Sequence, residues 1–199
     1  AAEAYAAAHA AVSFERHEGL EGGIPASALS SLAALMRLKG DLGEARAQAE
    51  RALSIQPDNP VFRYYLGALA ARTGDLDGAE RHLERLESLL RSARRFASDV
   101  YRDGLAGEIA LAREDPEQAR MHLERAVSSG RLNCEWTTAF RSPGTALREG
   151  LVRTYAALGL RTDQAQMLED LLSSGTDVAG HPVVHVLALY SLGLLKIEL

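Results

Sequence analysis

The chain repeats one pattern in ASALSSLAALMRLKGDLGEARAQAERALSIQPDN (residues 26–59) and in PVFRYYLGALAARTGDLDGAERHLERLESLL (residues 60–90). Gly40-Asp41-Leu42 aligns with Gly74-Asp75-Leu76 at an offset of 34 residues. Self-similarity at a fixed period of this size is the signature of repeat architectures. The rest of the chain can be aligned to this unit.

Each unit is predicted to form two helices joined by a tight turn. Apolar residues recur at helical spacing before and after Gly40-Asp41, which gives one buried stripe for each helix. Gly suits the residue that ends a helix, Asp caps the next one, and Pro57 stops the second helix. The stripes of the first unit are Leu29, Leu32, Ala33 and Met36, then Ala45, Ala49, Ala52 and Leu53.

These two units resemble the tetratricopeptide repeat family. They share its period and its order of Leu and a small residue, Gly-Asp and Ala, and the first unit also has the terminal Pro. The family's Trp near the start of the first helix is absent, because Leu29 and Arg63 stand there. The resemblance is close over residues 26–93 and weaker over residues 100–199. It implies an all-α fold, a right-handed α-solenoid of antiparallel helix pairs.

Later units follow the pattern with departures. Glu114 replaces the turn glycine of the third unit, Pro116 should begin the helix that follows, and the fourth unit fits if one residue is inserted in its turn near Gly159. We expect a single array in which the ends carry half units. Its parts are 1–18 (half unit), 26–59 (unit 1), 60–95 (unit 2), 100–130 (unit 3), 143–175 (unit 4) and 181–199 (half unit).

Composition and charge argue against several classes of protein. The net charge is −5 and no basic stripe runs along the chain, so nucleic-acid binding is not expected. No run of about 18 apolar residues exists, which argues against membrane insertion. The single cysteine, Cys134, cannot form an internal disulfide, and no signal peptide opens the chain. We expect a cytoplasmic protein. The start at Ala1 without Met predicts a processed chain or a segment of a longer one, and the half units at its ends predict a longer chain or ends that a partner covers.

The sequence offers no convincing chemistry, so we predict neither an enzyme nor a metal or other cofactor. His181 and His185 have the spacing of two ligands on one helix face, but no third ligand is evident. No family motif surrounds Cys134, and the glycines do not form a phosphate-binding loop.

The family resemblance implies a scaffold whose first helices line a concave groove that binds a peptide or a partner protein. Tyr and Arg are the side chains best suited to such contacts. The alternatives are a regulatory or sensor region of a larger signalling enzyme or transcription regulator, and an enzyme or small-molecule binder built in the groove. The predicted partner-binding residues are Arg37, Tyr64, Ala68, Arg72, Tyr101 and Glu108.

The last segment, residues 181–199, is apolar nearly all round its predicted helix. Such a helix must be covered. It therefore predicts either a homo-oligomer formed through residues 181–199 or a further helix that caps them.

Overall fold

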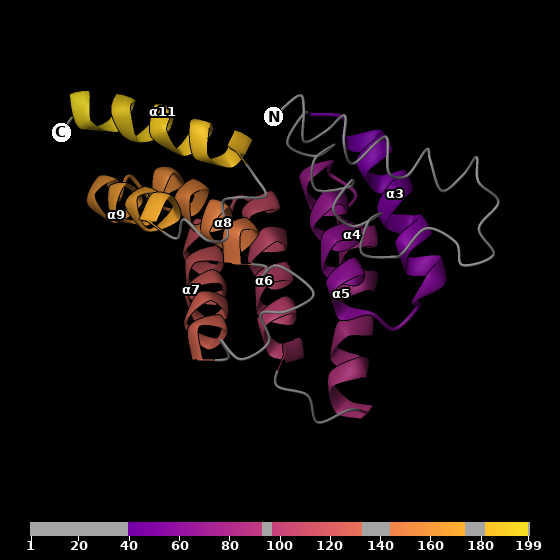
Figure 1. Cartoon of the computed structure of the whole chain (residues 1–199). Coiled ribbons are helices and arrows are strands. Elements are labelled where there is room, and N and C mark those ends of the chain that lie inside the picture. The colour runs from indigo at the N-terminus through magenta and orange to yellow at the C-terminus, as the bar shows by residue number, and fades with distance from the viewer. Residues whose placement is uncertain (1–39, 93–96, 133–143, 174–181, 199) are drawn as a thin grey trace.

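The computed structural model describes residues 40–92, 97–132, 144–173 and 182–198 (Figure 1). These residues are helical throughout apart from short turns, and they contain no strand. Successive helices pack in antiparallel pairs that stack into an α-solenoid, as the sequence predicts. The helices are α3 (Leu42–Ile55), α4 (Pro60–Arg72), α5 (Leu76–Ser92), α6 (Ala97–Ala112), α7 (Pro116–Leu132), α8 (Gly144–Ala157), α9 (Arg161–Ser173) and α11 (Pro182–Glu198).

The predicted Gly-Asp turns are confirmed at both places. Gly40 and Gly74 adopt φ values of 90° and 83°, in the left-handed region that glycine enters without steric cost. The next residue caps the following helix: the carboxylate of Asp41 accepts a bond of 3.2 Å from the Glu44 amide. Asp75 accepts the equivalent bond of 2.9 Å from the amide of Gly78. Each turn thus ends one helix and begins the next.

The third turn has the same backbone without glycine. Glu114 takes φ 60°, and it is the one non-glycine residue with positive φ in the described part of the chain. Asp115 caps α7 by accepting a bond of 3.1 Å from the Gln118 amide, and Pro116 begins the helix as predicted. The repeat therefore imposes its turn on a residue that is poorly suited to it.

The expectation of an inserted residue in the fourth turn was wrong. The Leu160 amide donates to the Tyr155 carbonyl at 2.9 Å, which matches the bond from Asp75 to Ala70 in the second turn. Gly159 has φ 70° and occupies the position of Gly74. Leu160 stands at the position of the capping residue Asp75, and Gln164 stands at the position of the small residue Ala79. Because the next small residue, Ala165, lies one position later, the sequence pattern suggested an inserted residue that the backbone does not contain.

Most of the core runs without a break from α4 to α9. Ala45, Ala49 and Ala52 of α3 are at most 2% exposed, so the predicted second-helix stripe is buried; the predicted first-helix stripe of unit 1 lies outside the described residues. The largest buried side chains of the continuous core are Tyr64, Leu86, Leu105, Leu123, Leu147 and Leu151.

A second, smaller cluster joins α11 to α9. Ala188, Leu192 and Leu195 of α11 are buried against Leu168 and Leu171 of α9. Pro182 begins α11, as predicted. Among the described helices, α11 packs mainly on α9, and Val152 of α8 also packs against this cluster.

Candidate protein-interaction surface

The predicted binding residues that the structure describes fall on α4 and α6, and α8 is the next first helix in the stack. The shared turn fixes their register, because residues equally far before Gly74, Glu114 and Gly159 are equivalent. Ala68, Glu108 and Arg153 form one such row. We call these positions the first-helix face: Val61, Tyr64, Ala68, Ala71 and Arg72 on α4, Tyr101, Gly104, Glu108 and Leu111 on α6, and Ala146, Glu149, Arg153 and Ala156 on α8.

Three tyrosines cluster where α4 meets α6. The ring of Tyr64 lies 5.6 Å from that of Tyr65 and 5.9 Å from that of Tyr101, centroid to centroid. A Cβ atom added to Gly104 would lie 3.1 Å from the Tyr64 ring, so the absence of a side chain at Gly104 makes room for it. Tyr64 is only 1% exposed, so its ring packs between repeats.

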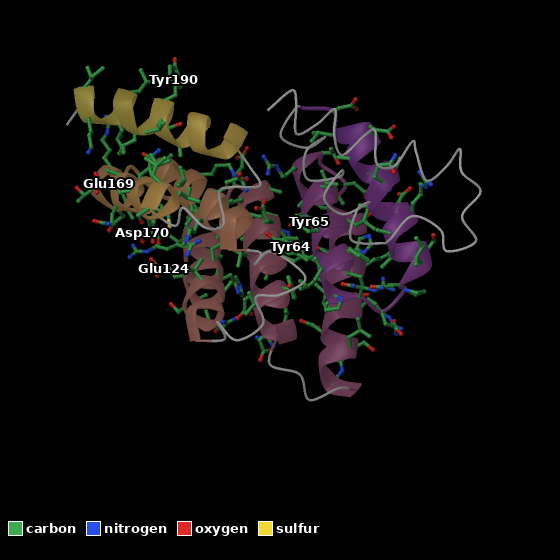
Figure 2. The ribbon with its side chains drawn as sticks, in the orientation of Figure 1. Tyr64, Tyr65, Glu124, Glu169, Asp170 and Tyr190 are labelled. Atoms are coloured by element: carbon green, nitrogen blue, oxygen red, sulfur yellow. The ribbon has the colours of Figure 1, made fainter. Side chains whose placement is uncertain are left out.

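Tyr65 and Tyr101 keep part of their surface exposed (Tyr64 and Tyr65 are labelled in Figure 2). Burial raises the pKa of Tyr101, so its hydroxyl stays protonated near neutral pH. The sequence analysis did not include Tyr65 among the partner-binding residues, although its position next to Tyr64 was a signal that could have found it. An aromatic edge with a hydroxyl can give a partner both apolar contact and a hydrogen bond.

An ion pair joins α6 to α8 within the row formed by Ala68, Glu108 and Arg153. Glu108 is 3% exposed, and its Oε1 accepts a bond of 2.5 Å from Nη2 of Arg153, whose side chain is 36% exposed. A Cβ atom on Gly150 would lie 3.3 Å from the same Oε1, so Gly150 leaves space for the carboxylate. Oε1 of Glu108 is therefore paired with Arg153, which the sequence analysis did not include because it assigned binding positions to the first three units only.

A second ion pair ties α6 to its own partner helix. Asp103 is 2% exposed, and both of its oxygens accept bonds of 2.6 Å from Nε and Nη2 of Arg125 on α7. Arg102 also contacts it at 3.0 Å. Bidentate pairing of this kind compensates the desolvation of a buried carboxylate and fixes geometry. It sets the position of α6 and hence of Tyr101.

The remaining predicted residues differ in exposure. Arg72 is exposed at the end of α4. Ala68 is 8% exposed, so it contributes little surface. Arg37 lies outside the described residues.

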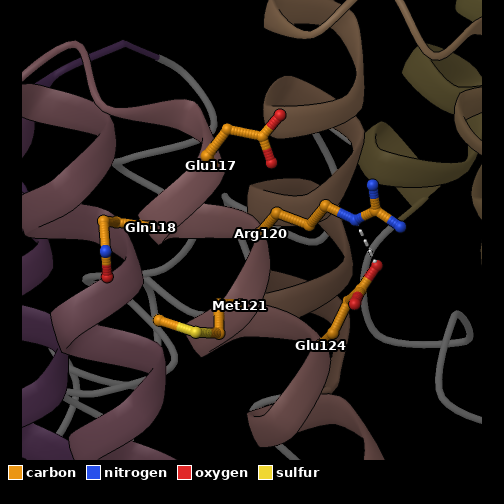
Figure 3. Close-up of a pocket in the computed structure, with 5 residues that line it drawn as sticks. All are labelled: Glu117, Gln118, Arg120, Met121 and Glu124. Carbon is orange, nitrogen blue, oxygen red and sulfur yellow. Dashed lines mark hydrogen bonds and ion pairs between the residues drawn. The ribbon is translucent and has the colours of Figure 1, made fainter.

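A shallow hollow lies elsewhere, on the second helix α7 (Figure 3). Its volume is about 400 Å³, and it is lined by Glu117, Gln118, Arg120, Met121 and Glu124. Arg120 donates to Glu124 at 2.9 Å, and Glu124 also accepts a bond of 3.0 Å from the Tyr155 hydroxyl. Burial and this bond raise the pKa of Tyr155 to about 12. The hollow contains none of the predicted binding residues.

Metal and membrane sites were also sought. Among the described residues, no three His, Cys, Asp or Glu side chains are grouped so that they could hold a metal ion. His181 and the side chain of His185 lie outside that part of the chain. No helix in the described ranges is long and apolar enough to cross a membrane.

Comparison with known proteins identifies the repeat. Residues 36–97, which contain α3, α4 and α5, match the family model of the tetratricopeptide repeat. A solved tetratricopeptide repeat protein from Parabacteroides merdae is similar over 99% of this chain and 71% of its own, with 15% identity and a TM-score of 0.44. No curated protein matches. Tetratricopeptide repeats generally mediate protein–protein interaction and are typically non-catalytic. Residues 36–97 are therefore tetratricopeptide repeats, as the spacing of Gly40 and Gly74 predicts.

Proposed function

We propose that this chain is a protein-interaction scaffold and that its first-helix face binds an extended segment of a partner protein. The observation that carries the proposal is the common register of α4, α6 and α8. The three turns that follow these helices have the same backbone, so equivalent residues recur at Ala68, Glu108 and Arg153. A face that continues across three units suits a chain that lies across them.

The chemistry of the accessible side chains supports a mixed apolar and polar partner. Tyr101 packs on Tyr64 and Tyr65 adjoins the same ring, so their orientations are largely set before a partner arrives. Rigid anchors lose little entropy on binding. Arg72 lies at the other end of α4 and is exposed. Its guanidinium can bind a carboxylate or a backbone carbonyl of the partner through two parallel bonds.

The ion pair between Glu108 and Arg153 limits where on the first-helix face a partner can make contact. Arg153 compensates the charge of Glu108 through Oε1, and Oε2 of Glu108 is buried without a hydrogen-bond partner among the described residues, so this carboxylate presents little surface to a partner. We therefore expect partner contacts at the tyrosine cluster and at Arg72, with the Glu108–Arg153 pair holding α6 and α8 in register between them.

The test selects binders from a displayed library of random extended peptides, with the whole chain as bait. The affinity of selected peptides is then measured by fluorescence polarisation for Arg72→Glu and for Arg81→Glu. Both arginines are exposed, but Arg72 ends the first helix α4 and Arg81 lies on the second helix α5. Circular dichroism verifies that both variants are folded.

We expect Arg72→Glu to weaken binding about tenfold, as loss of one interface anchor does, and Arg81→Glu to leave it unchanged. Equal affinities for both variants, combined with peptide-induced NMR shifts confined to α5 and α7, would place the site on the second helices and refute the proposal.

A further inference from the structure

Two second helices, α5 and α7, carry the same four residues at the same place in their units. His82-Leu83-Glu84-Arg85 and His122-Leu123-Glu124-Arg125 are 40 residues apart, as are the turns that precede them. The same offset relates Arg63 of α4 to Asp103 of α6. The two units therefore share a histidine and an arginine on the second helix but differ in the charge of one residue on the first helix.

Unit 3 shows what this histidine and arginine bind. The carboxylate of Asp103 accepts bonds of 2.6 Å from Nε and Nη2 of Arg125, and the same Nη2 lies 3.4 Å from Nδ1 of His122. The hydrogen bond with Asp103 is the main reason why the pKa of Arg125 is raised. In this unit the first helix thus supplies a carboxylate to the arginine and the histidine of the second helix.

In unit 2 the equivalent position holds a guanidinium. Arg63 lies one turn before Gly67 on α4, and a Cβ atom added to Gly67 would lie 3.1 Å from Cβ of His82. Arg63 and His82 are therefore neighbours where α4 packs on α5. Arg85 follows His82 by three residues and lies on the same side of α5. Three side chains that can carry positive charge thus meet without a carboxylate from the first helix.

Two nitrogen atoms at this place lack a hydrogen-bond partner. Nε of Arg63 and Nδ1 of His82 are both buried and bond to no described residue. The loop before α4 serves other atoms: the Pro57 carbonyl accepts from Nη2 of Arg63 at 2.5 Å, and Asp58 pairs with Arg85 at 2.6 Å. This last pair is exposed, so it contributes little stability. Buried nitrogens without partners are costly, which favours a ligand that accepts hydrogen bonds from them.

The charge around these nitrogens favours an anion. The groups that act on His82 are the cations Arg63, Arg46 and Arg81 and one carboxylate, that of Asp75. Burial is the largest cause and the arginines add to it, so the pKa of His82 is lowered. Burial and then Arg85 lower the pKa of Arg63 as well, against the opposing effect of Asp58. Arg46 is paired with Glu50, but Arg63 and Arg81 form no ion pair with a described residue.

We propose that Arg63, His82 and Arg85 form a binding site for an external carboxylate, equivalent to the internal carboxylate of unit 3. Arg85 is exposed and the other two side chains are half-buried, so the site opens to the surface at Arg85. Two guanidinium groups can hold one carboxylate through charge-assisted bonds. The carboxylate comes from a small free acid or from an acidic side chain of a protein. The site contains no residue of the first-helix face and is separate from it.

Side-chain NMR of the two equivalent histidines tests the site in the whole chain. Sodium acetate replaces sodium chloride at constant ionic strength up to about 100 mM, because a few charge-assisted bonds predict a dissociation constant on the order of millimolar. We expect the ring signals of His82 to shift along a saturating curve. Those of His122 should stay in place, because Asp103 already fills the equivalent position. His82→Gln and His122→Gln assign the signals.

Arg63→Asp is the decisive variant, because it gives α4 the carboxylate that α6 already has. The acetate response of His82 should disappear. Arg63→Gln removes the charge without adding a carboxylate and should raise the half-saturating concentration about tenfold. Arg91→Asp, at the exposed end of α5, makes the same change in net charge outside the site and should keep the response. Circular dichroism verifies that the variants are folded.

Two further ligands separate the sources and the class of the anion. A capped tetrapeptide with one glutamate, compared with its glutamine analogue, represents an acidic side chain: tighter binding than acetate assigns the site to a protein partner, and weaker binding assigns it to a small acid. Tighter binding of phosphate than of acetate would overturn the assignment of a carboxylate. A His82 signal without saturation, equal shifts of His82 and His122, or an acetate response that survives Arg63→Asp would overturn the site itself.

Discussion

Replacing Glu114 by glycine tests whether the repeat imposes its turn on an unsuitable residue. Glu114 adopts φ 60°, while the same position in the other described turns is held by Gly40, Gly74 and Gly159 with φ values between 70° and 90°. The side chain of Glu114 is exposed. The substitution therefore changes mainly the backbone preference.

The expected gain follows from two opposing contributions. A side chain in the left-handed conformation costs roughly 1–2 kcal/mol, which glycine removes. Glycine also increases the entropy of the unfolded chain, which takes back about 0.4–1 kcal/mol. We expect Glu114→Gly to raise the free energy of unfolding by about 1 kcal/mol through the difference between these two contributions.

Urea unfolding followed by far-ultraviolet circular dichroism measures the effect. With a slope of about 2–3 kcal/mol per molar urea, the midpoint should rise by roughly 0.3–0.5 M. Glu117→Gly is the matched control: it makes the same change three residues later, inside the first turn of α7. There glycine should lower the midpoint, because it weakens a helix by up to about 1 kcal/mol. A fall of the midpoint in both variants would refute the argument about Glu114.

Three further predictions concern packing, buried charge and pH. Gly67→Ala should lower stability by about 1–3 kcal/mol in urea titrations, because the new Cβ would lie 2.6 Å from Cδ2 of buried Leu105. Asp103→Asn should cost about 2–4 kcal/mol on the same scale, because Arg125 loses a buried bidentate acceptor. Burial, followed by neighbouring arginines, lowers the pKa of His82, so the unfolded chain takes up this proton at higher pH than the folded one. The urea midpoint should therefore fall as the pH drops through about 6.5, and His82→Gln should reduce that fall.

The local features of the fold were predictable from sequence because neighbouring residues determine them. Gly74-Asp75 specifies a helix end and a cap through hydrogen bonds within five residues. Pro116 and Pro182 begin helices because proline fits the first turn. The stripe Ala45, Ala49 and Ala52 needs only helical periodicity to be recognised.

The arrangement of the candidate surface depended on contacts between repeats, which periodicity does not reveal. Tyr64 is buried because Gly104, 40 residues later, leaves room for its ring. Glu108 meets Arg153 across 45 residues, and helical periodicity within either repeat does not show that these two side chains pair. Exposure, and with it the availability of each side chain to a partner, follows from these distant neighbours.

The attachment of α11 through its own small cluster has a consequence for how the molecule opens. Solenoid units are stabilised by their nearest neighbours, and among the described helices α11 packs mainly on α9. Leu168, Leu171 and three residues of α11 form a small cluster that meets the core spanning α4 to α9 at Val152. Its release exposes far fewer buried residues than opening that core does. Amide protons of α11 should therefore exchange with solvent through local detachment, while those of α6 and α7 exchange only when the whole array unfolds.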